Sequence, residues 1–333
     1  MTAIRASSPV GRVRAPSTVL LGLVAALVLI DLAAAIAAGG LVDQALVLVT
    51  HWIAQIAFVL AGARLLRDRP HAGLGRLMLA IAGVGALNGL SVSLHPVGLT
   101  EFAASFIDSL EVALIVHLLV RWPDRRVNGS LPRALVVAAY VVPLVLTAVW
   151  ELTWSPRWFD GDERSRAWIT LVPARDLSAA VWQVQQVVLV ALVVALLALV
   201  VAKALAGRGR RRAALVPVAI VAAVLAATDV VRIAVSLGAP IDIDPSAVQN
   251  LALLAVPIAV LVAVVRSPSV VDAPGQPGRR VHLDDAARER YHLGLAGVAA
   301  AIVVVIAVVF ATSSGQWPDA PSAPQPSPAL QGP

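Results

Sequence analysis

The fold is decided by stretches such as SAAVWQVQQVVLVALVVALLALVVA (residues 178–202), which carries no charged side chain over its whole length. A helix that crosses the hydrocarbon core of a bilayer needs about 20 mostly apolar residues. The length and the Leu, Val and Ala content of this stretch therefore predict a membrane-spanning helix. Outward from it, the same criteria predict nine spans in all, at residues 18–38, 41–63, 77–94, 102–120, 134–150, 178–202, 213–237, 247–265 and 293–312.

The overall composition is typical of an integral membrane protein. Of the 333 residues, 59% are apolar and 14% are charged, whereas a soluble domain has about 45–50% apolar and about 25% charged residues. The composition excludes an ordinary cytosolic enzyme and a disordered chain. The absence of cysteine excludes a disulfide framework, Cys-ligated zinc, an iron–sulfur cluster and a thiol nucleophile. We therefore expect an all-α, polytopic bundle whose principal partner is the lipid bilayer.

The positive charges predict how the spans are oriented. Cytoplasmic connections of membrane proteins carry an excess of Lys and Arg. With the N-terminus in the cytoplasm, 21 of the 26 Lys and Arg residues fall on the cytoplasmic side, and nine spans leave the C-terminus outside. This basic surplus indicates a cytoplasmic face and not a nucleic-acid footprint, and we expect a multi-pass protein of the bacterial plasma membrane.

The spans divide the chain into five predicted parts. They are a basic cytoplasmic N-terminus (1–17), an eight-helix membrane domain (18–266), a cytoplasmic linker (267–292), the ninth span (293–312) and a disordered, Pro-rich outer tail (313–333).

Ionisable side chains inside the spans are the candidate functional residues. Each costs about 2.5–3.5 kcal/mol near a helix centre unless it is paired or hydrated. The orientation above places all of them in the outer half of the membrane. We expect Arg232 to pair with Asp229 and with Asp108 or Glu111. The candidates are Asp31, His51 (with Gln55), Asp108, Glu111, Asp229 and Arg232.

Two interpretations of these residues remain open. They form either a polar clamp that fixes helix packing or a water-accessible cavity, open to the outside, that binds a small polar or cationic ligand or carries protons. Carboxylates outnumber basic groups, which favours cations or protonated carboxyls. In the third span, Gly85 and Gly89 have the spacing that lets helices approach closely.

Motifs for enzymatic chemistry are missing from the sequence. There is no H-E-x-x-H zinc site, no G-x-S-x-G nucleophile elbow, no P-loop lysine and no dinucleotide-binding glycine pattern after a strand. The six histidines lie at no metal-ligand spacing. We therefore predict no catalytic residue, no metal and no cofactor, and expect that the protein is not an enzyme.

Three short stretches resemble the multispanning N-terminal input domain of actinobacterial sensor histidine kinases. They are HLLVRWPDRR (117–126), RAALVPV (212–218) and LAVPIA (254–259), the last within a span that ends at Arg266. The similarity covers about residues 110–266. Arg125 stands where that family has glycine, and the chain then continues into a further span where those kinases have their catalytic region.

The resemblance implies a sensor-like or regulatory membrane module without its own catalytic output. Its cytoplasmic segments 203–212 and 266–292 would then contact a cytoplasmic or membrane signalling partner. Two other functions stay open on the residues alone. One is a small transporter or proton-coupled permease that uses the carboxylates within the spans, and the other is a structural or assembly protein.

Overall fold

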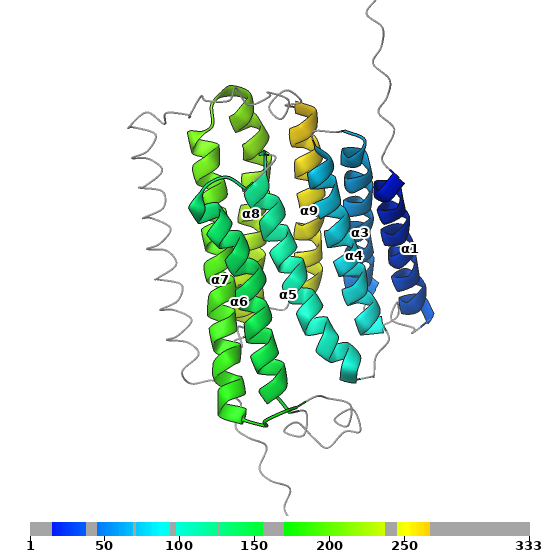
Figure 1. Ribbon diagram of the computed structural model, residues 1–333, viewed down its shortest axis with the longest axis vertical. Helices are drawn as coiled ribbons and strands as arrows, with labels where there is room; N and C mark the ends of the chain where they lie inside the picture. The colour runs from blue at the N-terminus through cyan, green and yellow to red at the C-terminus, as the bar shows by residue number, and fades with distance from the viewer. Residues whose placement is uncertain are drawn as a thin grey trace, which may run out of the picture.

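The computed structural model is an all-helical bundle (Figure 1). It describes residues 15–37, 45–68, 71–93, 98–124, 127–155, 170–236 and 245–266. The predicted N-terminal segment is described only from residue 15. The predicted linker, ninth span and Pro-rich tail lie outside the described residues.

Eight helices coincide with the first eight predicted spans. A helix of 22 residues is about 33 Å long, which suffices to cross a hydrocarbon core of about 30 Å. The helices are α1 (Ala15–Ala37), α3 (Ala45–Leu66), α4 (Ala72–Ser93), α5 (Gly98–Arg121), α6 (Ser130–Thr153), α7 (Arg175–Ala206), α8 (Gly209–Ser236) and α9 (Pro245–Arg266).

Seven of these helices are long and apolar enough to cross a membrane, and α9 contains a shorter apolar segment, Val248–Val264. The prediction of an all-α membrane bundle is thus confirmed for the described part of the chain. The number of nine spans stays a prediction.

The helices pack in a closed circuit. Consecutive helices run antiparallel (Figure 1), and α3, α4, α5, α7, α8 and α9 each pack against the next, with α9 returning to α3. Outside this circuit, α1 packs on α3 and α4, and α6 packs on α5 and α7. One continuous apolar core joins all eight helices.

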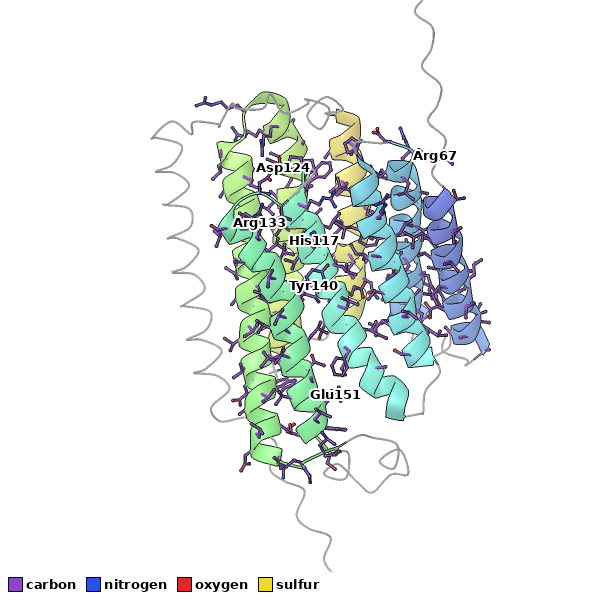
Figure 2. All side chains as sticks on the ribbon, in the orientation of Figure 1. Arg67, His117, Asp124, Arg133, Tyr140 and Glu151 are labelled. Atoms are coloured by element: carbon purple, nitrogen blue, oxygen red, sulfur yellow. The ribbon has the colours of Figure 1, made fainter. Side chains whose placement is uncertain are left out.

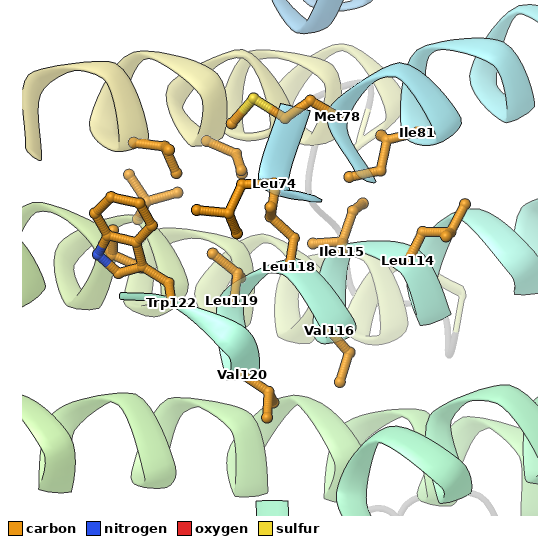
Figure 3. Close-up of a cluster of buried hydrophobic side chains, with 14 of the residues drawn as sticks. Leu74, Met78, Ile81, Leu114, Ile115, Val116, Leu118, Leu119, Val120 and Trp122 are labelled. Carbon is orange, nitrogen blue, oxygen red and sulfur yellow. The ribbon is translucent and has the colours of Figure 1, made fainter. Parts of the chain in front are cut away.

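Figure 3 shows part of that core, where side chains of α4 and α5 meet. Met78, Leu79 and Leu118 are fully buried there, and the indole of Trp122 is 1% exposed. Large apolar side chains such as Leu23 and Ile220 are exposed on the outside of the bundle. In a bilayer these side chains would face lipid, whose tails are as apolar as leucine.

Two turns show why particular helices begin where they do. Gly129 precedes α6 with φ of 96°, and Gly209 begins α8 with φ of 54°, a region of backbone conformation that L-residues with a side chain disfavour. Pro132 lies in the first turn of α6, where the missing N–H of proline costs no helical hydrogen bond.

The two ends of the bundle differ in charge. Arg67, Asp124 and Arg133 lie at one end and Glu151 lies toward the other (Figure 2). We call the first the basic end and the second the opposite end. Among the described side chains, Arg175 is the only Lys or Arg at the opposite end. The basic end carries Arg64, Arg67, Arg76, Arg121, Arg133, Lys203, Arg208, Arg211 and Arg212.

Candidate functional site

A cluster of polar side chains lies inside the bundle between α1, α3, α4 and α5. We define the polar cluster as Asp31, His51, Trp52, Gln55 and Glu111. It brings together three of the residues predicted from sequence, namely Asp31, His51 and Glu111, from three different helices. Asp31 and Gln55 are each 1% exposed and Glu111 is 7% exposed.

Asp31 on α1 is held by two neighbouring residues of α3. The indole Nε1 of Trp52 donates a hydrogen bond of 3.2 Å to Oδ2 of Asp31. Nε2 of His51 lies 3.5 Å from the same oxygen. A buried carboxylate is tolerated when it is hydrogen-bonded and paired with a group that can carry positive charge. This pair therefore attaches the peripheral helix α1 to the circuit.

Gln55 and Glu111 connect α3 with α5. The Gln55 side chain lies near the Glu111 carboxyl, which interacts electrostatically with His51 and with Asp108. His51 is thus within electrostatic range of both buried carboxyls. The polar cluster is one connected electrostatic group and not two separate contacts.

Two glycines of α4 make room for these polar side chains. A Cβ atom on Gly89 would lie 2.6 Å from both carboxylate oxygens of Asp31, and a Cβ on Gly85 would collide with the Gln55 amide. The sequence predicted that this glycine pair lets helices approach. The structure shows that the two glycines admit polar side chains of the neighbouring helices, because a larger residue would fill the space those side chains occupy.

Several buried polar atoms of the cluster lack a hydrogen-bond partner among the described residues. They are Oδ1 of Asp31, Nε2 of His51, Oε1 of Gln55 and Oε1 of Glu111. An unpaired buried polar atom costs about 1–3 kcal/mol. These unpaired atoms therefore lower the stability of the folded protein. A change of charge, or a ligand that supplies the missing hydrogen-bond partners, would change that stability.

The cluster extends from the middle of the bundle toward the opposite end. With 1.5 Å per residue, Gln55 lies at the middle of α3 and Glu111 within about 2 Å of the middle of α5. Asp31 lies about 8 Å from the middle of α1, on the side of its C-terminal end. The predicted position in the outer half of the membrane stays a prediction; within the bundle, Asp31 lies toward the opposite end and Glu111 is central.

The remaining predicted residues, Asp108, Asp229 and Arg232, are not members of the polar cluster. Asp108 lies one turn before Glu111, and its side chain is exposed. Asp229 is partly buried on α8, which packs against α7 and α9. The side chain of Arg232 lies outside the described part of the structure, so its pairing with carboxylates stays a prediction.

A second polar contact, which the sequence did not single out, joins α5, α6 and α7. Ser109 and Thr147 hydroxyls are 2.9 Å apart, and Nε2 of Gln185 donates to Thr147 at 3.1 Å. Glu151, placed in a loop by the predicted span boundary, belongs to the last turn of α6 and is fully buried. Uncharged polar residues within a span are common, and no sequence signal marks these.

The basic end holds a corner in which α5 meets α7 and α8. Nζ of Lys203 donates to the carbonyl oxygens of Val120 (2.6 Å) and Trp122 (3.3 Å). The Trp122 indole donates to the Ala214 carbonyl at 3.0 Å, and the Asp124 carboxylate lies 3.2 Å from an Arg211 nitrogen. The Trp122–Ala214 bond therefore joins residues 117–126 to residues 212–218.

The described side chains suggest no metal centre, and comparisons with known proteins do not assign a function to the polar cluster. Within the described ranges, no group of three or more His, Asp or Glu side chains is placed to hold a metal ion. No protein-family model, no curated protein and no solved structure matches the chain.

Proposed function

We propose that the protein is a sensor-like or regulatory multi-pass membrane protein without catalytic output of its own. The observation that supports this most directly is the polar cluster, a set of charged and unpaired groups that touches four helices at once. A change of charge or partner on one of its side chains would alter the packing of α1, α3, α4 and α5 together. A purely structural clamp would not need so many unpaired buried atoms.

The proposed orientation places the basic end in the cytoplasm. The concentration of Lys and Arg at one end supports it, because cytoplasmic connections carry such an excess. The N-terminus is then cytoplasmic and, with a ninth span at 293–312, the C-terminus is outside. We propose the bacterial plasma membrane as the location.

Helix α5 provides the path from the polar cluster to the cytoplasm. Trp122 directly follows the last residue of α5 and lies about 16 Å from Glu111 along the helix axis. At the basic end, Lys203 binds the last carbonyls of α5 and Trp122 contacts α8. A shift of α5 would therefore move the segments at 121–130 and 203–212, to which we assign the contact with a signalling partner. The resemblance of 117–126 to kinase input domains agrees with this role.

Hydrogen–deuterium exchange on the protein in lipid nanodiscs tests the coupling. Gln55→Leu and Asp31→Asn each remove a polar-cluster interaction without adding bulk. We expect both to speed exchange several-fold in peptides covering 121–130, which lie outside the cluster. Gln183→Leu, a matched change on α7, is expected to leave these peptides unchanged. Equal exchange in all variants would contradict the proposed function.

A transporter or proton-coupled permease is the second candidate. The observation that favours it is the pair of buried carboxyl groups of Asp31 and Glu111, both of which interact with His51. Proton flux into vesicles, measured with an internal pH-sensitive dye, would establish this function if Asp108→Asn or Glu111→Gln abolished it. Absence of flux in the wild type removes the candidate.

A further inference from the structure

We propose that the first turns of α8 bind an anionic phospholipid from the leaflet that meets the basic end. The phosphate group of the lipid contacts Arg212, and one acyl chain lies along the apolar stripe of α8, which we define as Val216, Ile220 and Val224. This binding site goes beyond the proposed function and does not depend on it.

An open cavity of about 480 Å³ lies at the start of α8. Its volume is within the range of about 300–1,000 Å³ that is usual for small-molecule sites. One cationic group is combined there with a lining that is otherwise apolar, and this combination suits a ligand with an anionic part and an apolar part. The lining residues are Gly209, Arg212, Ala213, Val216 and Pro217.

Arg212 carries a positive charge that no described carboxylate contacts. The Asp124 carboxylate of the same corner already lies 3.2 Å from Arg211 and 3.9 Å from Nζ of Lys203. Arg212 itself is exposed. A guanidinium group can bind a phosphate through two parallel hydrogen bonds, so Arg212 favours an anionic headgroup over a neutral one.

The apolar stripe continues from Arg212 toward the middle of the membrane. Its residues follow Arg212 at intervals of four, so they form one ridge along the helix surface, and all three are exposed. From Arg212 to Val224 the distance along the axis is about 18 Å, which is close to half of a hydrocarbon core of about 30 Å. The stripe therefore has the length of an acyl chain in one leaflet.

The position of Arg212 favours a lipid over a soluble anion. Arg212 is the second residue of the segment Arg211–Val231, which is long and apolar enough to cross a membrane. Its charge is therefore at the level of the headgroups, where basic side chains attract anionic lipids. A lipid contacts the guanidinium and covers the stripe at once, whereas a free phosphate or an acidic peptide would leave the stripe uncovered.

Arg64 on α3 provides a matched control. It is exposed at the same basic end, and Leu60 and Ile56, four and eight residues before it, are exposed as well. The cavity at α8 does not include Arg64. A charge at the end of an apolar ridge is thus common to both arginines, and the cavity distinguishes Arg212.

Native mass spectrometry of the full chain in detergent tests the site, with phosphatidylglycerol as the anionic lipid and phosphatidylcholine as the zwitterionic one. We expect the wild type to retain several-fold more phosphatidylglycerol. Arg212→Gln should lower this preference several-fold, and Ala213→Leu should lower it by filling the cavity without a change of charge. Arg64→Gln should keep the preference of the wild type. Circular dichroism checks the folding of each variant, and Ala213→Leu decides if Arg212→Gln does not fold.

Three results would overturn the proposal. The first is a wild type without the preference, or a preference that survives Arg212→Gln or Ala213→Leu in the folded protein. The second is an equal loss in Arg64→Gln, which would assign the preference to the general charge of the basic end. The third is displacement of the lipid by an excess of glycerol phosphate, since the ligand would then be the headgroup alone.

Discussion

Trp52 shows how a single aromatic residue makes a buried carboxylate tolerable. Its ring is 7% exposed, and the ring N–H is its only donor. By directing that donor to Oδ2 of Asp31, it satisfies an oxygen that His51 approaches only at 3.5 Å. The indole thus combines an apolar body that fits the core with a polar edge that serves the carboxylate.

Trp52→Phe is expected to destabilise the protein by about 1.5–3 kcal/mol, the range for a hydrogen bond to a charged group. Unfolding in detergent, followed by circular dichroism, measures the change. In the double variant with Asp31→Asn, the tryptophan substitution should cost much less, because the charge it serves is gone. Fully additive effects of the two substitutions would show that the indole and the carboxylate do not interact.

The charged members of the polar cluster were predictable from sequence and its uncharged members were less so. Asp31, His51 and Glu111 stand out because an ionisable residue in an apolar span is costly. Trp52 carries no such signal, since tryptophan occurs in membrane helices without a buried partner. Which carboxylate meets which donor depends on the rotation of each helix about its axis, and sequence does not fix that rotation.

At the scale of helices, glycines of α4 determine which parts of the neighbouring helices can approach it closely. Gly85 and Gly89 accommodate side chains, whereas Gly75 accommodates backbone. A Cβ on Gly75 would lie 2.8 Å from the Gly62 carbonyl oxygen and 2.9 Å from the Leu66 nitrogen. The backbones of α3 and α4 therefore come close together near the basic end, away from the Gly85–Gly89 spacing that sequence indicated.

Alanine substitutions should separate these kinds of glycine. Gly89→Ala is expected to cost about 1–3 kcal/mol by overpacking, and Gly75→Ala more, because backbone moves less readily than a carboxylate. Gly83→Ala is the control on the same helix: its Cβ would be 3.5 Å from Val24, an ordinary contact. It should be neutral or stabilising by up to about 1 kcal/mol. Unfolding midpoints of the three variants give the order, and equal losses would contradict it.

Helix ends were harder to predict than helices. The predicted third span begins at residue 77, yet α4 begins at Ala72. Gly75 and Arg76 lower the local hydropathy there, and the helix persists because Gly75 packs against α3. Similarly, α6 continues through Glu151 because that residue is buried by its neighbours. Hydropathy reports transfer into lipid and does not include such helix–helix contacts.

For the whole molecule, the closed circuit of helices could not be predicted from the sequence. Every span is apolar around most of its surface, so the pattern does not say which face meets a neighbour. The contact of α9 with α3 joins segments about 200 residues apart, and Asn250 strengthens it by donating to the Val47 carbonyl at 3.1 Å. The circuit is what places α3 and α5 on either side of α4 and so creates the polar cluster.

The orientation of the whole molecule can be measured because the chain has no cysteine. Single cysteines at Asp176, an exposed residue of the opposite end, and at Arg67, an exposed residue of the basic end, provide the two reporters. In intact cells, a membrane-impermeant maleimide should label Asp176→Cys, while Arg67→Cys should react only after permeabilisation. The positive-inside distribution is the physical reason, and the cysteine-free parent is the control. The reverse labelling pattern would invert the topology and would place the polar cluster on the cytoplasmic side of the membrane centre.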